Sequence, residues 1–215
     1  MRETTVNAYT QRALPCPTFA KPPAGYTKPT MKYLATLLLG FVILLCAQQK
    51  PFVPDDFQVP EMFTSKQGLY KLRPLGPKIA RLDYDAYMSS IGHLQRTFSF
   101  STSWPNDKIT MADAVKDVEG EEAAFKARRK FTYAVLNMLE TRELGCVYIS
   151  PSNKEGYDAV VRMWVTENQA EIGFDQRLYE EVRAWVGGRW PFGKVAYVGN
   201  EISREAFAKL PAKAK

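Results

Sequence analysis

The sequence predicts an α+β domain with a mixed, mostly antiparallel sheet and helices on both faces. Residues 131–136 and 145–149 form two short apolar segments separated by a turn, which predicts an antiparallel hairpin. A strand at 158–165, a helix from Asp175 and a strand at 194–198 then follow in the order of a β-α-β crossover. A sheet that combines a hairpin with a crossover has strands of both directions and helices on its faces.

Composition limits the classes of function. The chain has 215 residues, of which 46% are hydrophobic, and this suffices for one folded domain with an appendage. The net charge is +6, but Lys and Arg alternate with Asp and Glu, so we expect no nucleic-acid binding. Cys16, Cys46 and Cys146 lack the paired spacings of metal sites and disulfide frameworks, and His93 is the single histidine. The sequence therefore predicts no metal site.

The N-terminal region has the composition of a targeting segment. Residues 1–30 are rich in proline and are expected to be disordered or to lie upstream of the true start, since Met31 can serve as a start codon. An uncharged apolar run follows Lys21, Lys28 and Lys32, so residues 31–49 are predicted to be a signal peptide or a membrane anchor. The run is shorter than the ~20 residues of a typical spanning helix. Cys46 is disfavoured as a lipidation site because Leu45 precedes it.

The location that follows from this segment is exported or membrane-anchored. Lysines precede the apolar run, and the positive-inside rule then places the rest of the chain outside the cytoplasm. The alternative is a cytoplasmic protein in which the run is a buried core helix.

The folded domain is predicted to span residues 70–211, between a proline-containing linker at 50–69 and a tail at 212–215. It begins with a strand at 70–75. An apolar stripe at 3.6-residue spacing predicts a helix at 79–94. His93 would lie in the last turn of this helix, where a histidine usually stabilises the helix dipole, so it is not assigned to catalysis.

Three further helices are predicted from caps and stripes. Thr110 and Asp113 have the spacing of a capping box and open a helix that reaches about Arg128. Asp175 is expected to cap the crossover helix, which ends at the glycine pair 187–188. The apolar stripe of that helix consists of Leu178, Val182, Trp185 and Val186. Residues 204–210 form a last short helix.

The strand at 158–165 has one apolar and one mixed face. The apolar face contains Ala159, Val161, Met163 and Val165. The mixed face contains Asp158, Val160, Arg162 and Trp164. A strand covered by a helix on one side and facing a cleft on the other has this pattern. An ordinary half-buried strand with its charges in solvent fits the pattern equally well.

With these elements in place, the domain resembles the GNAT superfamily of acyl-CoA-dependent N-acetyltransferases, above all its small bacterial members. The resemblance rests on the element order and on the segments FTYAVL, LGCVYI, GYDAVVRMWV and WPFGKVAYVG. It implies acetyl-CoA as the cofactor and an amine of a small molecule or peptide as the acceptor.

The resemblance also implies a cofactor site. In the family, the strands that match 158–165 and 194–198 diverge in a V, and the pantetheine arm pairs with the backbone of the first strand. The diphosphate is bound by the following loop and the next helix N-terminus. The matching residues here are Trp164, Val165, Gln169, Gly173 and Arg177.

The loop departs from the family pattern of Gln or Arg, two residues, Gly, one residue, then Gly or Ala. Gln169 and Gly173 are one residue too far apart, and Asp175 stands where a small residue is expected. Glu167 and Glu171 add further negative charge close to the expected diphosphate.

The resemblance suggests catalytic residues as well. Asp158 matches the carboxylate that acts as a base on the cleft strand, and its alternative role is to bond the amides of a nearby turn. The family's tyrosine acid is replaced by Phe207, which leaves Tyr197 and Tyr148 as substitutes, and Tyr197 is taken as the candidate acid.

The family's closing pair of strands has no counterpart after the last helix, and a second chain in a homodimer is one way to supply it.

The sequence leads to two hypotheses about function. The first is an N-acetyltransferase of unknown acceptor, and the second is a non-catalytic, exported binding protein that keeps the fold.

Overall fold

The computed structural model describes residues 52–98 and 104–214. The disordered segment expected at 1–30 and the signal peptide or anchor expected at 31–49 lie outside this part of the chain. Within the described ranges, no helix has both the length and the apolar character needed to cross a membrane.

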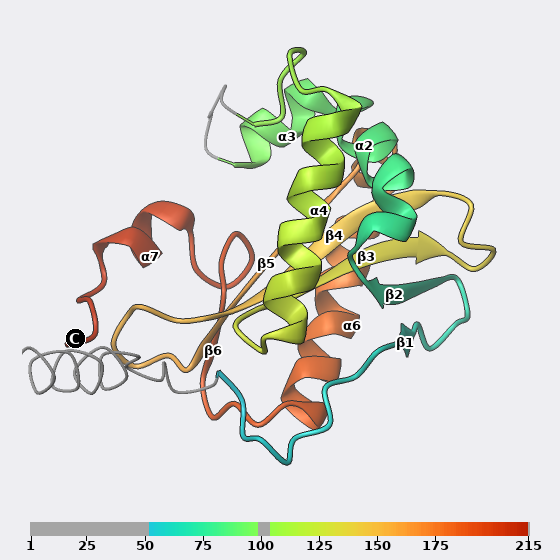
Figure 1. The fold of residues 1–215 in the computed structure, drawn as a ribbon. Coiled ribbons are helices and arrows are strands. Elements are labelled where there is room, and N and C mark those ends of the chain that lie inside the picture. Colours follow the sequence, from blue (N-terminus) through green and yellow to red (C-terminus); the bar gives the residue numbers. More distant parts are fainter. Residues whose placement is uncertain (1–51, 99–103, 215) are drawn as a thin grey trace, which may run out of the picture. The chain divides into compact units, whose positions relative to one another are not determined.

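The domain is built on a six-stranded sheet in the order β1-β2-β3-β4-β5-β6 (Figure 1). The strands are β1 (Phe63–Thr64), β2 (Tyr70–Pro74), β3 (Phe131–Asn137), β4 (Glu143–Pro151), β5 (Ala159–Val165) and β6 (Val195–Tyr197). Neighbouring strands from β1 to β5 are antiparallel, and β5 and β6 are parallel. The prediction of a mixed, mostly antiparallel sheet is confirmed.

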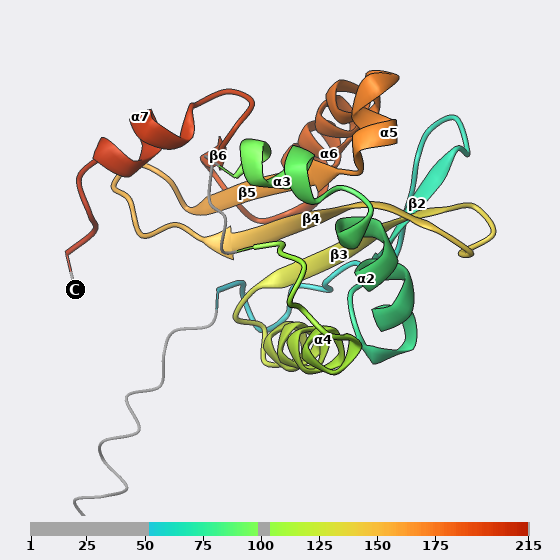
Figure 2. The same cartoon turned by 90° about the horizontal axis from the view of Figure 1, so that it is seen from above.

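Helices cover both faces of this sheet, as expected. The helices are η1 (Pro77–Ile79), α2 (Ala80–Met88), α3 (Ile91–Thr97), α4 (Met111–Lys126), α5 (Glu167–Glu171), α6 (Phe174–Arg189) and α7 (Arg204–Lys209). Figure 2 shows α2 and α4 on one side of the sheet and α6 on the other.

The alternating faces of the strands divide the core into two layers. Val161, Met163 and Val165 pack with the buried stripe of α6 in one hydrophobic cluster. Trp164 packs with buried residues of α2, α3 and α4 in a second cluster. The two-faced pattern predicted for the strand at 158–165 is confirmed, and both faces are covered along most of the strand.

The segment expected to be a linker at 50–69 packs on the domain from Phe52 onward. Val53 is buried, and the Phe52 ring stacks on Phe131 with 5.8 Å between ring centroids. The ring of Phe57 lies 5.4 Å from that of Trp190. Proline spacing did not indicate these contacts because they are made between residues distant in sequence.

The helix predicted at 79–94 is wrong as a single element, since the chain breaks at Ser89 and Ser90 between α2 and α3. The Ser89 hydroxyl donates to the carbonyl of Ala86 at 2.7 Å, and a side chain that bonds its own helix backbone favours a helix end. His93 therefore lies in the first half of α3 and not in a last turn.

The ends of the crossover helix also differ from expectation. The N-cap of α6 is Gly173, with a left-handed φ of 69° that glycine adopts without strain, and Asp175 lies in the first turn. The helix continues through the predicted stop at 187–188 to Arg189. In contrast, the capping box of α4 is confirmed, because the Thr110 hydroxyl accepts from the Asp113 N–H at 3.2 Å and Asp113 accepts from the Thr110 N–H at 2.9 Å.

A close approach of two strands requires glycine at position 145. A Cβ atom there would lie 2.1 Å from the carbonyl oxygen of Trp164 on β5. The register between β3 and β4 shifts next to this position, between Val135 and Leu136. Gly145 thus lets β4 press closely against the end of β5.

Two buried acidic side chains lie between α2 and the sheet. Asp83 of α2 is 4% exposed and Glu143 of β4 is 2% exposed. Burial raises the pKa of Asp83 to about 7, with the charges of Asp117 and Glu121 acting in the same direction. Burial and the neighbouring Asp83 hold the pKa of Glu143 well above its usual range. Neither Glu143 oxygen has a hydrogen-bond donor among the described residues. A proton shared between the two carboxyl groups would satisfy one of these oxygens and remove the repulsion between two buried charges.

The first prediction concerns the packing of α6. Trp185 is 8% exposed and contacts the rings of Phe63, Tyr133 and Trp190. Trp185→Ala should lower the free energy of unfolding by about 3–5 kcal/mol, the range for large aromatic truncations in cores. Urea denaturation measures this change, with Glu180→Ala on the exposed face of α6 as the control. A loss below about 1 kcal/mol would show that α6 does not pack on the sheet through this side chain.

The second prediction concerns the buried acids. The pKa of Asp83 is about 3.9 in an unfolded chain and about 7 in the folded protein. Between these values only the folded protein keeps the proton, so the free energy of unfolding falls as pH rises from about 4 to 7, by about 1.4 kcal/mol per pH unit for one such group. Asp83→Asn removes this titration, and its unfolding free energy should fall less steeply over that range than that of the wild type. Asp85→Asn, at an exposed position of the same helix, is the control; equal slopes for all three proteins would contradict the shared proton.

Candidate functional site

The site is built where β5 and β6 separate. The parallel pairing covers Ala159 to Val161 on β5, and the last contact is the Val198 N–H donating to the Val161 carbonyl at 3.0 Å. The chain then turns away at Gly199, whose φ of 99° favours glycine. Beyond Val161, β5 continues without β6 beside it.

The separation leaves backbone groups of β5 facing an open gap. Backbone groups along a strand point alternately to its two neighbours, and those of Val161 point to β6. The N–H and C=O groups of Met163 and Val165 therefore point to the same side, where the pairing has ended. An extended ligand chain can hydrogen-bond to such groups as a further strand would.

A cavity of about 230 Å³, here called the gap cavity, lies at this position. It is lined by residues from β5, from the turn after β6, and from α3, α6 and α7: His93, Thr97, Met163, Trp164, Val165, Asp175, Val198, Gly199, Asn200 and Arg204.

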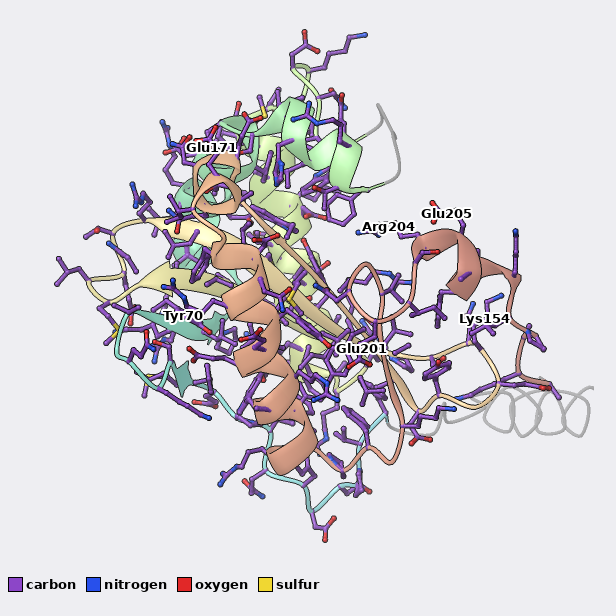
Figure 3. All side chains as sticks on the ribbon, turned by 180° about the vertical axis from the view of Figure 1, so that it is seen from behind. Tyr70, Lys154, Glu171, Glu201, Arg204 and Glu205 are labelled. Carbon is purple, nitrogen blue, oxygen red and sulfur yellow. The ribbon has the colours of Figure 1, made fainter. Side chains whose placement is uncertain are left out.

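Two basic side chains, those of His93 and Arg204, line the gap cavity. His93 is half-buried on α3. Arg204, at the start of α7 (Figure 3), donates from Nε to the carbonyl of Thr97 at 2.8 Å, and its guanidinium carbon lies 4.7 Å from the centre of the Phe98 ring. These contacts hold α7 against α3 and fix the guanidinium beside the cavity. Asp175 brings a carboxylate from the opposite side.

Trp164 and Val165, two of the residues expected to bind the cofactor, line the gap cavity. The Trp164 ring is buried, and its Nε1 donates to the hydroxyl of Tyr148 at 3.0 Å. Trp104 packs on the same ring, with 6.2 Å between the ring centroids. The indole is therefore part of the wall of the gap cavity. At this position a ligand can hydrogen-bond to the backbone of β5.

The other three expected cofactor residues lie apart from the gap cavity. Gln169 belongs to α5 and lines a different cavity, of about 370 Å³, together with Glu143. Gly173 caps α6. Arg177 is exposed on α6 and is close enough to Tyr70 to oppose the rise in the pKa of that phenol, which burial and Glu181 cause.

The expected diphosphate loop forms the short helix α5 instead. The N–H groups of Gln169 and Ala170 both donate to the carbonyl of Thr166, and the N–H of Gly173 donates to that of Ala170. Glu167 forms an ion pair with Arg96 at 3.2 Å. These N–H groups are hydrogen-bonded within the chain. The loop that is one residue longer than the family pattern is thus folded as the helix α5.

Asp158 does not lie at the gap. Its Oδ2 accepts from the N–H groups of Gly193 and Lys194, each at 2.8 Å, which is the turn-bonding role left open by the sequence. It precedes Met163 by five residues, a span of ~16 Å along a strand.

Tyr197 does not line the gap cavity either. Burial, followed by the charge of Glu201, raises the pKa of Tyr197 to about 12. Its hydroxyl makes a long contact of 3.5 Å with the carbonyl of Arg183 on α6. Asp158 and Tyr197 thus lie beside or on strands of the site, at the start of β5 and on β6, but neither lines the gap cavity.

Sequence reasoning missed His93 and Arg204 as residues of the site. His93 is the single histidine of the chain, which was a usable signal, but the predicted helix continued past Ser90 and placed it in a last turn. Arg204 had no local signal, because its position depends on how α7 packs beside α3. Within the described ranges, no three side chains of His, Cys, Asp or Glu form a group able to hold a metal ion. Cys146 is free and buried.

Comparison with known proteins gives matches among solved structures only. No protein-family model matches the chain, and no curated protein sequence matches it. RimL, a ribosomal L7/L12 alpha-N-protein acetyltransferase in complex with coenzyme A, is 16% identical with a TM-score of 0.45, over 58% of this chain and 66% of that chain. A ribosomal-protein-S5-alanine acetyltransferase from Vibrio fischeri is 16% identical with a TM-score of 0.44, over the same shares.

The microcin C7 self immunity acetyltransferase MccE, in complex with acetyl-CoA and AMP, is 19% identical with a TM-score of 0.42, over 56% of this chain and 63% of that chain. Identities below 25% and TM-scores below 0.5 describe a likeness of fold and carry no information on substrate or activity.

The third prediction tests the role of Asp158. Asp158→Ala removes the acceptor for two backbone N–H groups and should lower the free energy of unfolding by about 1–3 kcal/mol. Asp158→Asn keeps one acceptor oxygen and should lose less. Thermal denaturation of both variants measures the effect, and unchanged stability in the Ala variant would leave Asp158 free for another role.

Proposed function

We propose that this chain is a member of the GNAT superfamily that transfers an acyl group from acetyl-CoA to an amine. The observation that carries the proposal is the separation of β5 from β6 beyond Val161, with a cavity at the gap. The fold resemblance supports this assignment of the gap to an acyl-CoA, because the family's cofactor arm pairs with the matching strand.

The backbone of β5 would hold the cofactor arm. The N–H and C=O groups of Met163 and Val165 face the gap, and the amide groups of pantetheine are suitable partners for them. When bound, acetyl-CoA supplies a thioester that is open to attack by an amine. A backbone N–H of β5 that points to the thioester oxygen stabilises the negative charge that develops there.

His93 is the proposed general base. The acceptor amine is an ammonium at neutral pH and must lose a proton before it attacks, and histidine is the residue that most often accepts such a proton. His93 lies on the gap cavity, whereas Asp158 bonds turn amides at the far end of β5. The acceptor is an amine of a small molecule or peptide.

The second candidate is a non-catalytic binding protein that keeps the fold. Its support is α5, which uses the N–H groups of the expected diphosphate loop and carries Glu167 and Glu171, with Asp175 following. The two candidates also differ in the location that they require. Acetyl-CoA is a cytosolic cofactor, so the enzyme requires that the apolar segment at 31–49 is a membrane tether or precedes the true start. The non-catalytic binding protein is compatible with export.

The fourth prediction concerns acetyl-CoA binding and turnover. Isothermal titration measures the binding of acetyl-CoA, and release of the coenzyme A thiol in the presence of a panel of amines measures turnover. We expect measurable acetyl-CoA binding, and His93→Gln should keep it while lowering turnover about 100-fold or more, the range for removal of a general base. Asp158→Asn is the matched variant and should keep the wild-type rate in the folded protein.

Absence of binding at millimolar acetyl-CoA would favour the non-catalytic candidate. A normal rate in His93→Gln together with a slow Asp158→Asn enzyme would instead return the role of base to Asp158.

A further inference from the structure

A second pocket, here called the Arg162 pocket, adjoins the gap cavity. It has a volume of about 440 Å³ and is lined by Phe98, Asn153, Lys154, Arg162, Val198, Arg204, Phe207 and Ala208. Val198 and Arg204 line both spaces, so a bound molecule in the Arg162 pocket lies next to the open part of β5. None of these described lining residues is acidic.

Arg162 is a half-buried cation that has no carboxylate partner among the described residues. It lies on the mixed face of β5, one residue before Met163, and its guanidinium carbon is 5.7 Å from the centre of the Phe207 ring on α7. Among the described residues it forms no ion pair. Burial lowers the pKa of Arg162 below its usual range, so its charge is held there against a desolvation penalty.

Arg204 is a second such cation in the same pocket. It also forms no ion pair with the described residues. Burial lowers its pKa, the charge of Arg162 acts in the same direction, and the charge of Glu205 opposes both. Glu205, the next residue along the chain, is exposed and does not line the pocket.

Lys154 adds a third positive charge. Its Nζ donates to the carbonyls of Ala208 and Leu210 at 2.6 and 2.7 Å, beneath α7 in Figure 3. These bonds hold the end of α7 over the pocket. Three cations thus lie around a space to which the described part of the chain brings no acidic side chain, and an anionic ligand there would offset the repulsion among them.

We propose that the Arg162 pocket binds a carboxylate of the acyl acceptor, so that the acceptor is a small amine that also carries an acidic group. This inference rests on the proposed acyltransferase function. Guanidinium groups bind carboxylates through paired hydrogen bonds, and Arg162 and Arg204 offer two of them. A carboxylate held there leaves the amine of the same molecule beside the gap cavity and His93.

The phosphates of acetyl-CoA are the other possible source of an anion in this pocket. The face of β5 on which Arg162 lies argues against them. Arg162 lies on the side of β5 opposite to Met163 and α6, since Met163 packs with α6 and Arg162 contacts α7. The family resemblance places the diphosphate at the start of α6. The acceptor is therefore the source that fits this pocket.

The test uses glutarate, a dicarboxylate without an amine, titrated calorimetrically into the full chain with and without saturating coenzyme A. Glutarate should bind in both cases with the same affinity. Arg162→Gln should weaken this binding about tenfold or more, because a charged hydrogen bond pair is lost. Lys209→Gln makes the same charge change on the exposed side of α7 and should bind as the wild type does. Arg162→Lys, which keeps the charge, should fall between them, and thermal denaturation confirms that each variant is folded.

Turnover with matched amines gives the second arm. The wild type should acetylate L-glutamate and β-alanine at a kcat/KM about tenfold or more above that for L-glutaminamide and β-alaninamide, which lack a carboxylate, and Arg162→Gln should remove the difference.

The outcomes separate this inference from the proposed function. Glutarate binding that depends on Arg162, without any binding of acetyl-CoA, would support the anion site and overturn the acyltransferase. Acetyl transfer with equal rates for each matched pair would overturn the acceptor class alone. Displacement of glutarate by coenzyme A, with weaker coenzyme A binding in Arg162→Gln, would assign the pocket to the phosphates of the donor and overturn the inference.

Discussion

The unequal pairing of β5 with its two neighbours determines the architecture of the site. Seven residue pairs join β5 to β4, from Ala159 to Val165, whereas only three join it to β6. The antiparallel pairing keeps β5 straight and buried to its end, and Gly145 on β4 makes the closest approach there possible. The parallel pairing ends at Val161, and everything proposed about ligand binding depends on the backbone that this leaves open.

Two adjacent residues of β5, Arg162 and Met163, lie in different chemical environments on opposite faces of the sheet. Met163 points into the layer packed by α6 and leaves its backbone groups at the gap. Arg162 points to the other face and meets the ring of Phe207 on α7. A strand with side chains on alternate faces can in this way place a donor site and an anion site side by side without a long loop. Glu167 and Glu171 on α5, and Asp175 on the first turn of α6, do not line the Arg162 pocket.

Sequence patterns predicted the parts of the fold that depend on local interactions. The alternation in β3 and β5, the capping box at Thr110 and the stripe of α6 each rely on residues a few positions apart, and each is found as expected. The break at Ser89 and Ser90, the cap at Gly173 and the packing of Phe52 depend on distant contacts or on a backbone conformation that no periodicity indicates. The candidate site shows the same division. Trp164 and Val165 could be placed at the gap because they belong to the strand, but His93 and Arg204 come from helices whose positions are set by tertiary packing.

The central claim is that an acyl-CoA binds to the backbone of β5 beyond its pairing with β6. Nuclear magnetic resonance of the amide groups during titration with coenzyme A tests it directly. The account predicts that the largest shifts occur at the N–H groups of Met163 and Val165 and in the turn at 198–200, with little change at Asp158, Gly193 and Lys194. Shifts confined to other parts of the domain, or none at millimolar coenzyme A, would contradict it.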